Sequence, residues 1–140
     1  MRLFITFLAI LMPSVALAEA YEVQMLNRNA SGSMVYDPPY LNVQIGDSVK
    51  FVATRAGHDA VSIEGMLPEG ATPIKGKLNE EITVTFDVEG LYGIKCTPHY
   101  AMGMVMLIEV GAQEATVEDL PTDLPERAAE RLQAYLNHSE

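Results

Sequence analysis

Cysteine is almost absent from this sequence: Cys96 is the single one among 140 residues. One cysteine cannot form a disulfide within its own chain, so a disulfide-stabilised scaffold is excluded. The thiol is then either an inert buried side chain, which behaves as a small hydrophobic group, or a ligand. The residues around Cys96 decide between these two interpretations.

Positive charge is also scarce. The chain carries nine Lys and Arg against nineteen Asp and Glu, which gives a formal net charge of −10 at pH 7. Nucleic-acid phosphates and anionic membrane surfaces attract basic proteins. We therefore expect no nucleic acid and no anionic membrane surface among the partners.

Long hydrophobic runs are missing except at the start of the chain. Leu3 to Met12 is apolar apart from one threonine, follows Arg2, and is then interrupted by a proline. A membrane-spanning helix needs about 20 apolar residues, which this run does not reach. Ala18 and the alanine two positions before it are the small residues that signal peptidase requires. The pattern predicts a signal peptide over residues 1–18, export of the rest, and no membrane insertion.

The remaining residues, 19–140, have the length of one domain with a sizeable core. Short segments of alternating apolar and polar residues fill the chain as far as Val110, separated by Gly, Pro, Asn and Asp. This period of two predicts an all-β sandwich or barrel. We expect antiparallel pairing throughout, because parallel pairs would require crossover helices that this part of the chain lacks. The predicted strands are 21–27, 40–45, 48–54, 60–63, 82–88, 91–96 and 104–110.

The periodicity changes after Gly111. One or two C-terminal α-helices are predicted between residues 115 and 138. Leu124, Ala128, Leu132 and Leu136 then share one face of an amphipathic helix that folds back on the sandwich.

The loop from Cys96 to Met104 has the spacing Cys-x2-His-x4-Met and joins two predicted strands. A thiolate, an imidazole and a thioether suit copper, because sulfur ligands favour Cu(I) and imidazole serves both oxidation states. His58 is the candidate for a fourth ligand. The spacing alone leaves Met102 and Met104 nearly equal as the thioether ligand. The loop predicts a copper site of the blue, electron-transferring type.

Three other classes of protein remain open on these residues. A copper chaperone or storage protein would use the same ligand types in a more open site. A hydrolase would use Cys96 as nucleophile and His99 as base, but no oxyanion-hole motif or orienting acid accompanies them. A binding module with an incidental cysteine is the third. Visible colour with Cu(II) separates the blue-copper carrier from the chaperone.

Taken together, these features resemble the pseudoazurins, small periplasmic blue-copper proteins of the cupredoxin superfamily. The resemblance covers nearly the whole chain after residue 18. It is carried by Cys96 to Met106, by the segments 46–51 (Gly-Asp-Ser-Val-Lys-Phe), 25–27 (Met-Leu-Asn) and 68–71 (Pro-Glu-Gly-Ala), and by the C-terminal helix, which plastocyanins usually lack. It implies a Greek-key sandwich of about eight strands.

The resemblance also implies a ligand set for one copper ion per monomer. The ligands would be His58, Cys96, His99 and Met104. Other residues would surround that site: Met102, Met34, Gly57 and Pro98 in an apolar collar, with Asp59 and Thr97 linking the histidine strand to the cysteine loop.

Asp59 departs from the family pattern, which usually has asparagine directly after the first histidine ligand. Its carboxylate still accepts a hydrogen bond from Thr97 but cannot donate one. If it is ionised, its charge favours Cu(II) and lowers the reduction potential. If burial keeps it protonated, it resembles asparagine.

By the same resemblance the protein is a monomeric electron carrier rather than an enzyme. Pseudoazurins commonly exchange electrons with copper nitrite reductase or c-type cytochromes in the periplasm. Docking would use a basic rim around the collar, formed by five of the six basic residues between Tyr21 and Val110: Arg28, Arg55, Lys75, Lys77 and Lys95.

Overall fold

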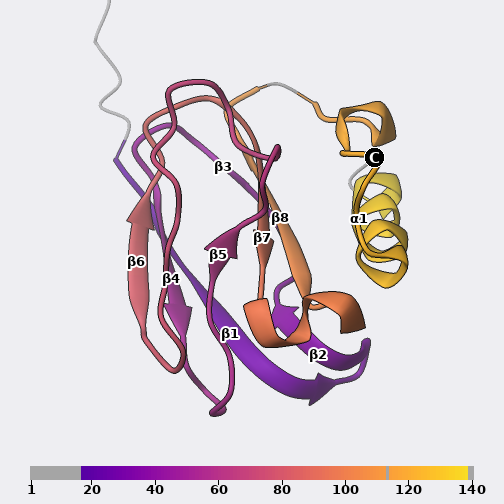
Figure 1. The fold of residues 1–140 in the computed structure, drawn as a ribbon. Helices are drawn as coiled ribbons and strands as arrows, with labels where there is room; N and C mark the ends of the chain where they lie inside the picture. Colours follow the sequence, from indigo (N-terminus) through magenta and orange to yellow (C-terminus); the bar gives the residue numbers. More distant parts are fainter. Residues whose placement is uncertain (1–16, 113, 139–140) are drawn as a thin grey trace, which may run out of the picture.

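The structure is a computed structural model that describes residues 17–112 and 114–138. In this part of the chain, eight strands form two four-stranded sheets (Figure 1). One sheet has the strand order β2-β1-β4-β6 and the other β3-β8-β7-β5. The predicted all-β sandwich is confirmed. The strands are β1 (Ala20–Asn29), β2 (Gly32–Asp37), β3 (Tyr40–Val43), β4 (Ser48–Val52), β5 (Val61–Ser62), β6 (Ile82–Thr85), β7 (Gly90–Lys95) and β8 (Val105–Val110).

The expectation of purely antiparallel pairing is wrong. Strand β1 runs parallel to β4, with Val23 opposite Phe51, and β3 runs parallel to β8, with Leu41 opposite Ile108. No helix is needed between β1 and β4, because the chain passes through β3 in the opposite sheet before it returns. A crossover through the other layer of a sandwich therefore replaces the helix of a βαβ unit.

Strand β2 is the one that alternation did not predict. Its neighbouring residues Val35 and Tyr36 are both buried, and the residues before them are all half-buried, so the strand has no period of two. It forms a hairpin with β1 in which Met25 lies opposite Tyr36.

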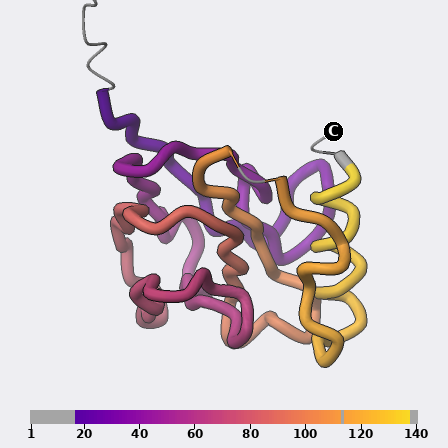
Figure 2. Tube along the Cα trace, turned by 90° about the horizontal axis from the view of Figure 1, so that it is seen from above, coloured from indigo at the N-terminus to yellow at the C-terminus, as the bar shows by residue number. Residues whose placement is uncertain are grey.

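The C-terminal region confirms the predicted helix. It contains one short 3-10 turn, η2 (Val117–Asp119), and one α-helix, α1 (Glu126–His138). Ala128, Leu132 and Leu136 are buried on its inner face, in a cluster that includes Val105 and Leu107 of β8. Figures 1 and 2 both place α1 along one side of the sandwich.

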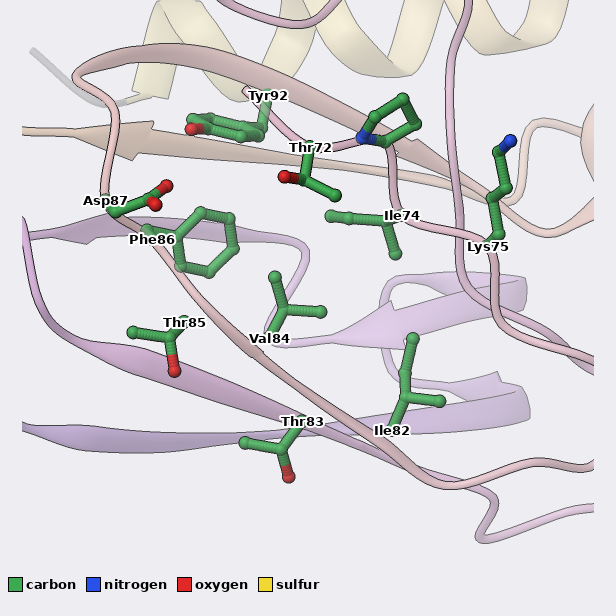
Figure 3. A pocket seen from close by; sticks show the side chains of 11 residues that line it. Thr72, Ile74, Lys75, Ile82, Thr83, Val84, Thr85, Phe86, Asp87 and Tyr92 are labelled. Carbon is green, nitrogen blue, oxygen red and sulfur yellow. The ribbon is translucent and has the colours of Figure 1, made fainter. Parts of the chain in front are cut away.

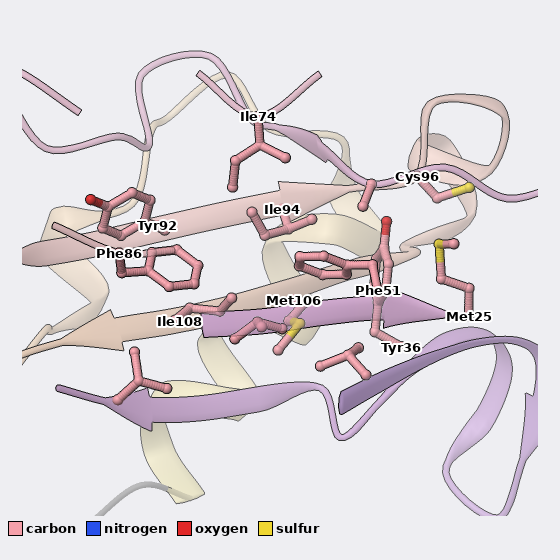
Figure 4. Close-up of a cluster of buried hydrophobic side chains, with 14 of the residues drawn as sticks. Met25, Tyr36, Phe51, Ile74, Phe86, Tyr92, Ile94, Cys96, Met106 and Ile108 are labelled. Atoms are coloured by element: carbon pink, nitrogen blue, oxygen red, sulfur yellow. The ribbon is translucent and has the colours of Figure 1, made fainter. Parts of the chain in front are cut away.

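A second cluster fills the space between the sheets. Figure 4 shows it extending from Phe86 and Tyr92 at one end to Met25 and Cys96 at the other. The rings of Phe86 and Tyr92 meet edge to face with centroids 4.9 Å apart. Cys96 is therefore itself part of the core, and the buried side chains of both sheets hold it in place.

The signal peptide predicted over residues 1–18 falls almost wholly outside the described residues and stays a prediction. Among the residues that the structure describes, no helix is long and apolar enough to cross a bilayer.

Candidate metal centre

Cys96 follows the last residue of β7 and opens a tight loop. The 3-10 helix η1 (Thr97–Met102) comes next, and Gly103, with φ of +83°, ends it in the left-handed region. The backbone closes the loop on itself: the amide of Cys96 donates to the carbonyl of Met104 at 3.0 Å, and the amide of Met104 donates to the carbonyl of His99 at 3.1 Å. These hydrogen bonds hold the three predicted loop ligands in one short frame.

The structure brings three potential donor atoms to one point. The Sγ atom of Cys96 lies 3.7 Å from Nδ1 of His58 and 3.5 Å from Nδ1 of His99. All three ligand atoms lie within 4.8 Å of one another. His58 and Cys96 are fully buried, and the ring of His99 is half-buried.

The two nitrogen–sulfur distances fit donors that share one metal ion. With metal–nitrogen distances of about 2.0–2.1 Å and a metal–sulfur distance of about 2.3 Å, a nitrogen and a sulfur donor at 120° are about 3.8 Å apart. The two observed N–S distances are 3.7 and 3.5 Å. Two imidazoles and one thiolate in this arrangement are the donor set of blue-copper sites.

Asn27 determines which nitrogen of His58 faces the site. Its Oδ1 atom lies 2.8 Å from Nε2 of His58. Because Oδ1 accepts, Nε2 carries the proton and Nδ1 keeps its lone pair directed at Cys96. Nothing in the local pattern of residues predicts this role for Asn27, apart from its place in the segment 25–27.

Burial shapes the proton affinities of the donors. It lowers the pKa of His58, with the neighbouring His99 acting in the same direction and Asp59 opposing them. Burial also raises the pKa of the Cys96 thiol, while hydrogen bonding from the backbone of Asp59 and of His99 lowers it. A neutral imidazole is ready to bind a metal, whereas the thiol must release its proton to the incoming ion.

The two methionines that spacing left open lie in different environments. Met104 is fully buried in the cluster that contains Cys96, whereas the side chain of Met102 is 42% exposed. Met34, near the start of β2, is half-buried against the same cluster and has φ of +53°. The structure thus places Met104 inside and Met102 on the surface.

Asp59 joins the segment that carries His58, between β4 and β5, to the loop that carries His99. Its Oδ1 atom accepts a hydrogen bond from the Thr97 amide at 2.6 Å, as expected from the sequence. Its own carbonyl accepts one from the buried hydroxyl of Tyr36 at 2.7 Å. Gly57 is fixed in turn, because its amide donates to Oδ1 of Asn79 at 2.6 Å.

The residues of the predicted basic rim are spread over several segments. Arg28, Arg55, Lys75 and Lys77 are exposed, as is Pro98 of the collar, while Lys95 is half-buried with its Nζ 4.8 Å from the centre of the Tyr100 ring. Within the described residues, the ion pair at the surface joins Lys50 to Glu81 and involves none of these five. Their role in docking stays a prediction.

A cavity of about 370 Å³ lies away from this centre, between β6 and residues 72–75 (Figure 3). Ile74, Ile82, Val84 and Phe86 line it, together with Lys75. None of the predicted ligands contributes to its wall.

Comparisons with known proteins agree with this centre. A family model described as copper binding proteins of the plastocyanin/azurin family matches residues 23–111. The chain is 42% identical over 120 residues to a pseudoazurin of Paracoccus pantotrophus, covering 85% of this chain and 83% of the relative. It is 46% identical over 103 residues to a pseudoazurin of Methylorubrum extorquens, covering 74% of this chain and 70% of that relative.

The fold agrees with a solved structure as well. The crystal structure of a pseudoazurin from Methylobacterium extorquens AM1 superposes with a TM-score of 0.80 at 38% identity, covering 86% of this chain and 99% of that one. Sequence, fold and donor set point the same way: this chain belongs to the pseudoazurins, within the copper-binding plastocyanin/azurin family.

Proposed function

We propose that this protein is a periplasmic electron carrier with one copper ion, held by His58, Cys96, His99 and Met104 and cycling between Cu(II) and Cu(I). The observation that carries the proposal is the buried triangle of two Nδ1 atoms and one Sγ atom at distances of 3.5 and 3.7 Å. Met104 completes the set because it is buried beside Cys96 and its backbone is hydrogen-bonded to the same loop.

The protein's contribution to electron transfer is rigidity. When bound, copper supplies a one-electron couple whose two oxidation states prefer different geometries. The backbone hydrogen bonds of the loop, the Asn27 contact and the link between Asp59 and Thr97 resist movement of the donors. Ligands that stay in place between the two states keep the reorganisation small.

His99 is the proposed route for electrons into and out of the site. Its ring is half-buried, whereas His58 and Cys96 are fully buried, so it offers the donor nearest the surface. Met102 and Pro98, both exposed, lie in the same loop. A partner that covers this loop would exclude water and approach the imidazole edge.

The proposed partners are redox proteins such as copper nitrite reductase or c-type cytochromes, which a monomer would contact transiently. The exposed basic residues favour partners whose docking surfaces are acidic, because opposite charges steer association. Export to the periplasm is supported by the predicted signal peptide.

The test is a visible and EPR spectrum of the protein loaded with Cu(II). An electron carrier of this type should be intensely blue through sulfur-to-copper charge transfer, and Cys96→Ser should abolish the colour while circular dichroism shows an unchanged sandwich. A nearly colourless protein that passes copper readily to a chelator would instead be a chaperone. Protection of Cys96 from iodoacetamide by copper checks the thiolate ligand independently.

A further inference from the structure

Arg131 of helix α1 reaches from the C-terminal helix to two segments beside the metal centre. Its Nη1 atom donates to the carbonyl of Gly103 at 2.7 Å and to the carbonyl of Met34 at 2.7 Å. Its Nη2 atom donates to the carbonyl of Ser33 at 2.8 Å. One guanidinium therefore ties the end of the ligand loop to the hairpin between β1 and β2.

The two ends of this tie differ in their backbone. Gly103, with φ of +83°, is in a region that glycine adopts without strain, and its amide already donates to the carbonyl of Tyr100. Met34 has φ of +53°, a conformation that is uncommon for a residue with a side chain and that persists where the surrounding structure enforces it. Hydrogen bonds from a charged donor to these two carbonyls supply that constraint.

The helix leaves little room for the loop to move. A side chain at Gly103 would bring its Cβ within 2.9 Å of the backbone oxygen of Arg127. Gly103 directly precedes Met104, so its position limits where the Met104 sulfur can lie. The helix thus contacts the loop at the residue before Met104, the proposed thioether ligand.

An arginine is suited to this contact and a lysine is not. The guanidinium is planar and presents five N–H donors in a fixed fork, whereas an ammonium is a compact point charge on a flexible stem. Arg131 is half-buried, and the ion pair among the described residues does not include it. The three carbonyls are its partners in place of a carboxylate.

We propose that Arg131 is a positioning residue for the copper loop, which sets the place of Met104 by holding the carbonyls of Gly103 and Met34. This inference rests on the proposed function, since it assumes that Met104 would supply the thioether ligand. It assigns the C-terminal helix a part in tuning the metal site, in addition to its part in covering β8.

The experiment compares Arg131→Gln and Arg131→Lys with Arg127→Gln. Arg127 is on the same helix with an exposed side chain. Glutamine keeps its Cβ and its backbone oxygen, the atoms that lie against Gly103, so the replacement removes the same charge and leaves the three carbonyl contacts in place. In the metal-free protein, amide hydrogen exchange at Gly103 and Met104 should become about tenfold faster in both Arg131 variants, because a charge-assisted hydrogen bond is lost. The Arg127 variant should exchange as the unaltered protein does.

The copper-loaded proteins give the second readout. Both Arg131 variants should show a changed ratio of the charge-transfer bands and a shifted reduction potential, since the Met104 sulfur would no longer be held in the same place. Lower thermal stability with an unchanged spectrum, potential and loop exchange would overturn the proposal and leave Arg131 a structural residue. An unaltered protein that is not blue would contradict the proposed function instead.

A measurement on the unaltered protein covers the case in which neither variant folds. Nuclear magnetic resonance should detect slowly exchanging guanidinium protons of Arg131, close in space to the α-protons of Gly103 and Met34. Rapidly exchanging guanidinium protons without these contacts would also overturn the proposal.

Discussion

The Nε2 atom of His58 lies 2.8 Å from Oδ1 of Asn27, a residue of strand β1, whose sheet does not contain the strand that leads to Cys96. The two residues are 31 positions apart in the sequence, and within the described part of the chain Asn27 is the hydrogen-bond partner of that ring nitrogen. It orients the imidazole so that Nδ1 faces the Cys96 sulfur at 3.7 Å. The geometry of this ligand is therefore controlled from a different sheet than the one that carries the cysteine.

Replacing Asn27 by Ala should weaken copper binding. Loss of the partner that fixes a ligand histidine typically reduces metal affinity by about 10–100-fold. Competition with a copper chelator measures the change. Asn29→Ala is the matched control, because Asn29 is on the same strand and its amide donates to Asp37 instead. Equal affinities for the two variants would show that Asn27 does not act through His58.

Replacing Met104 by Gln should keep a blue-type site but shift its reduction potential. An amide oxygen would replace the weakly binding thioether, and the identity of this ligand tunes the reduction potential of such sites. Met102→Gln is the control, because that side chain is 42% exposed whereas Met104 is fully buried. Cyclic voltammetry of both variants decides the assignment, and a shift confined to Met102→Gln would mean that the other sulfur is the ligand.

Replacing Asp59 by Asn should raise the reduction potential by tens of millivolts, because a negative charge near the site favours Cu(II). The Asn side chain retains an oxygen that accepts from the Thr97 amide, so the loop contact of 2.6 Å survives the change. Asp87→Asn is the control: it removes the same charge at an exposed residue beside Tyr92, at the far end of the core (Figures 3 and 4). Identical potentials for Asp59→Asn and the unaltered protein would contradict the expected charge effect.

Association with an acidic redox partner should slow as ionic strength rises. Steering by the exposed basic residues is screened over about 10 Å at 0.1 M salt. Stopped-flow measurements should show a lower rate for Lys77→Gln, with a weaker salt dependence. Lys50→Gln serves as control, because Lys50 is paired with Glu81 at 3.3 Å on the sheet surface. A rate that is flat or rises with salt would exclude a basic docking rim.

Strand periodicity and the helical face of the C-terminal region were predictable because both depend on neighbouring residues. Ser48 to Val52 and Ile82 to Thr85 form strands in which polar side chains alternate with apolar ones that need a buried face. Strand β2 was not predicted because it lacks this alternation: Val35 and Tyr36 are adjacent and both buried. The parallel pairs were not predicted because they depend on how the chain passes between the two sheets. The alternation of apolar and polar residues carries no information about that path.

The sequence by itself determined the chemistry of the site, since Cys96, His99 and two candidate methionines occupy one loop of nine residues. The tertiary structure decided how that chemistry is arranged. It buried Met104 and exposed Met102, set Asn27 against His58, and brought Arg131 to carbonyls as far as 98 positions away. Donor types are a property of single side chains, whereas their orientation results from packing between segments that meet once the chain has folded.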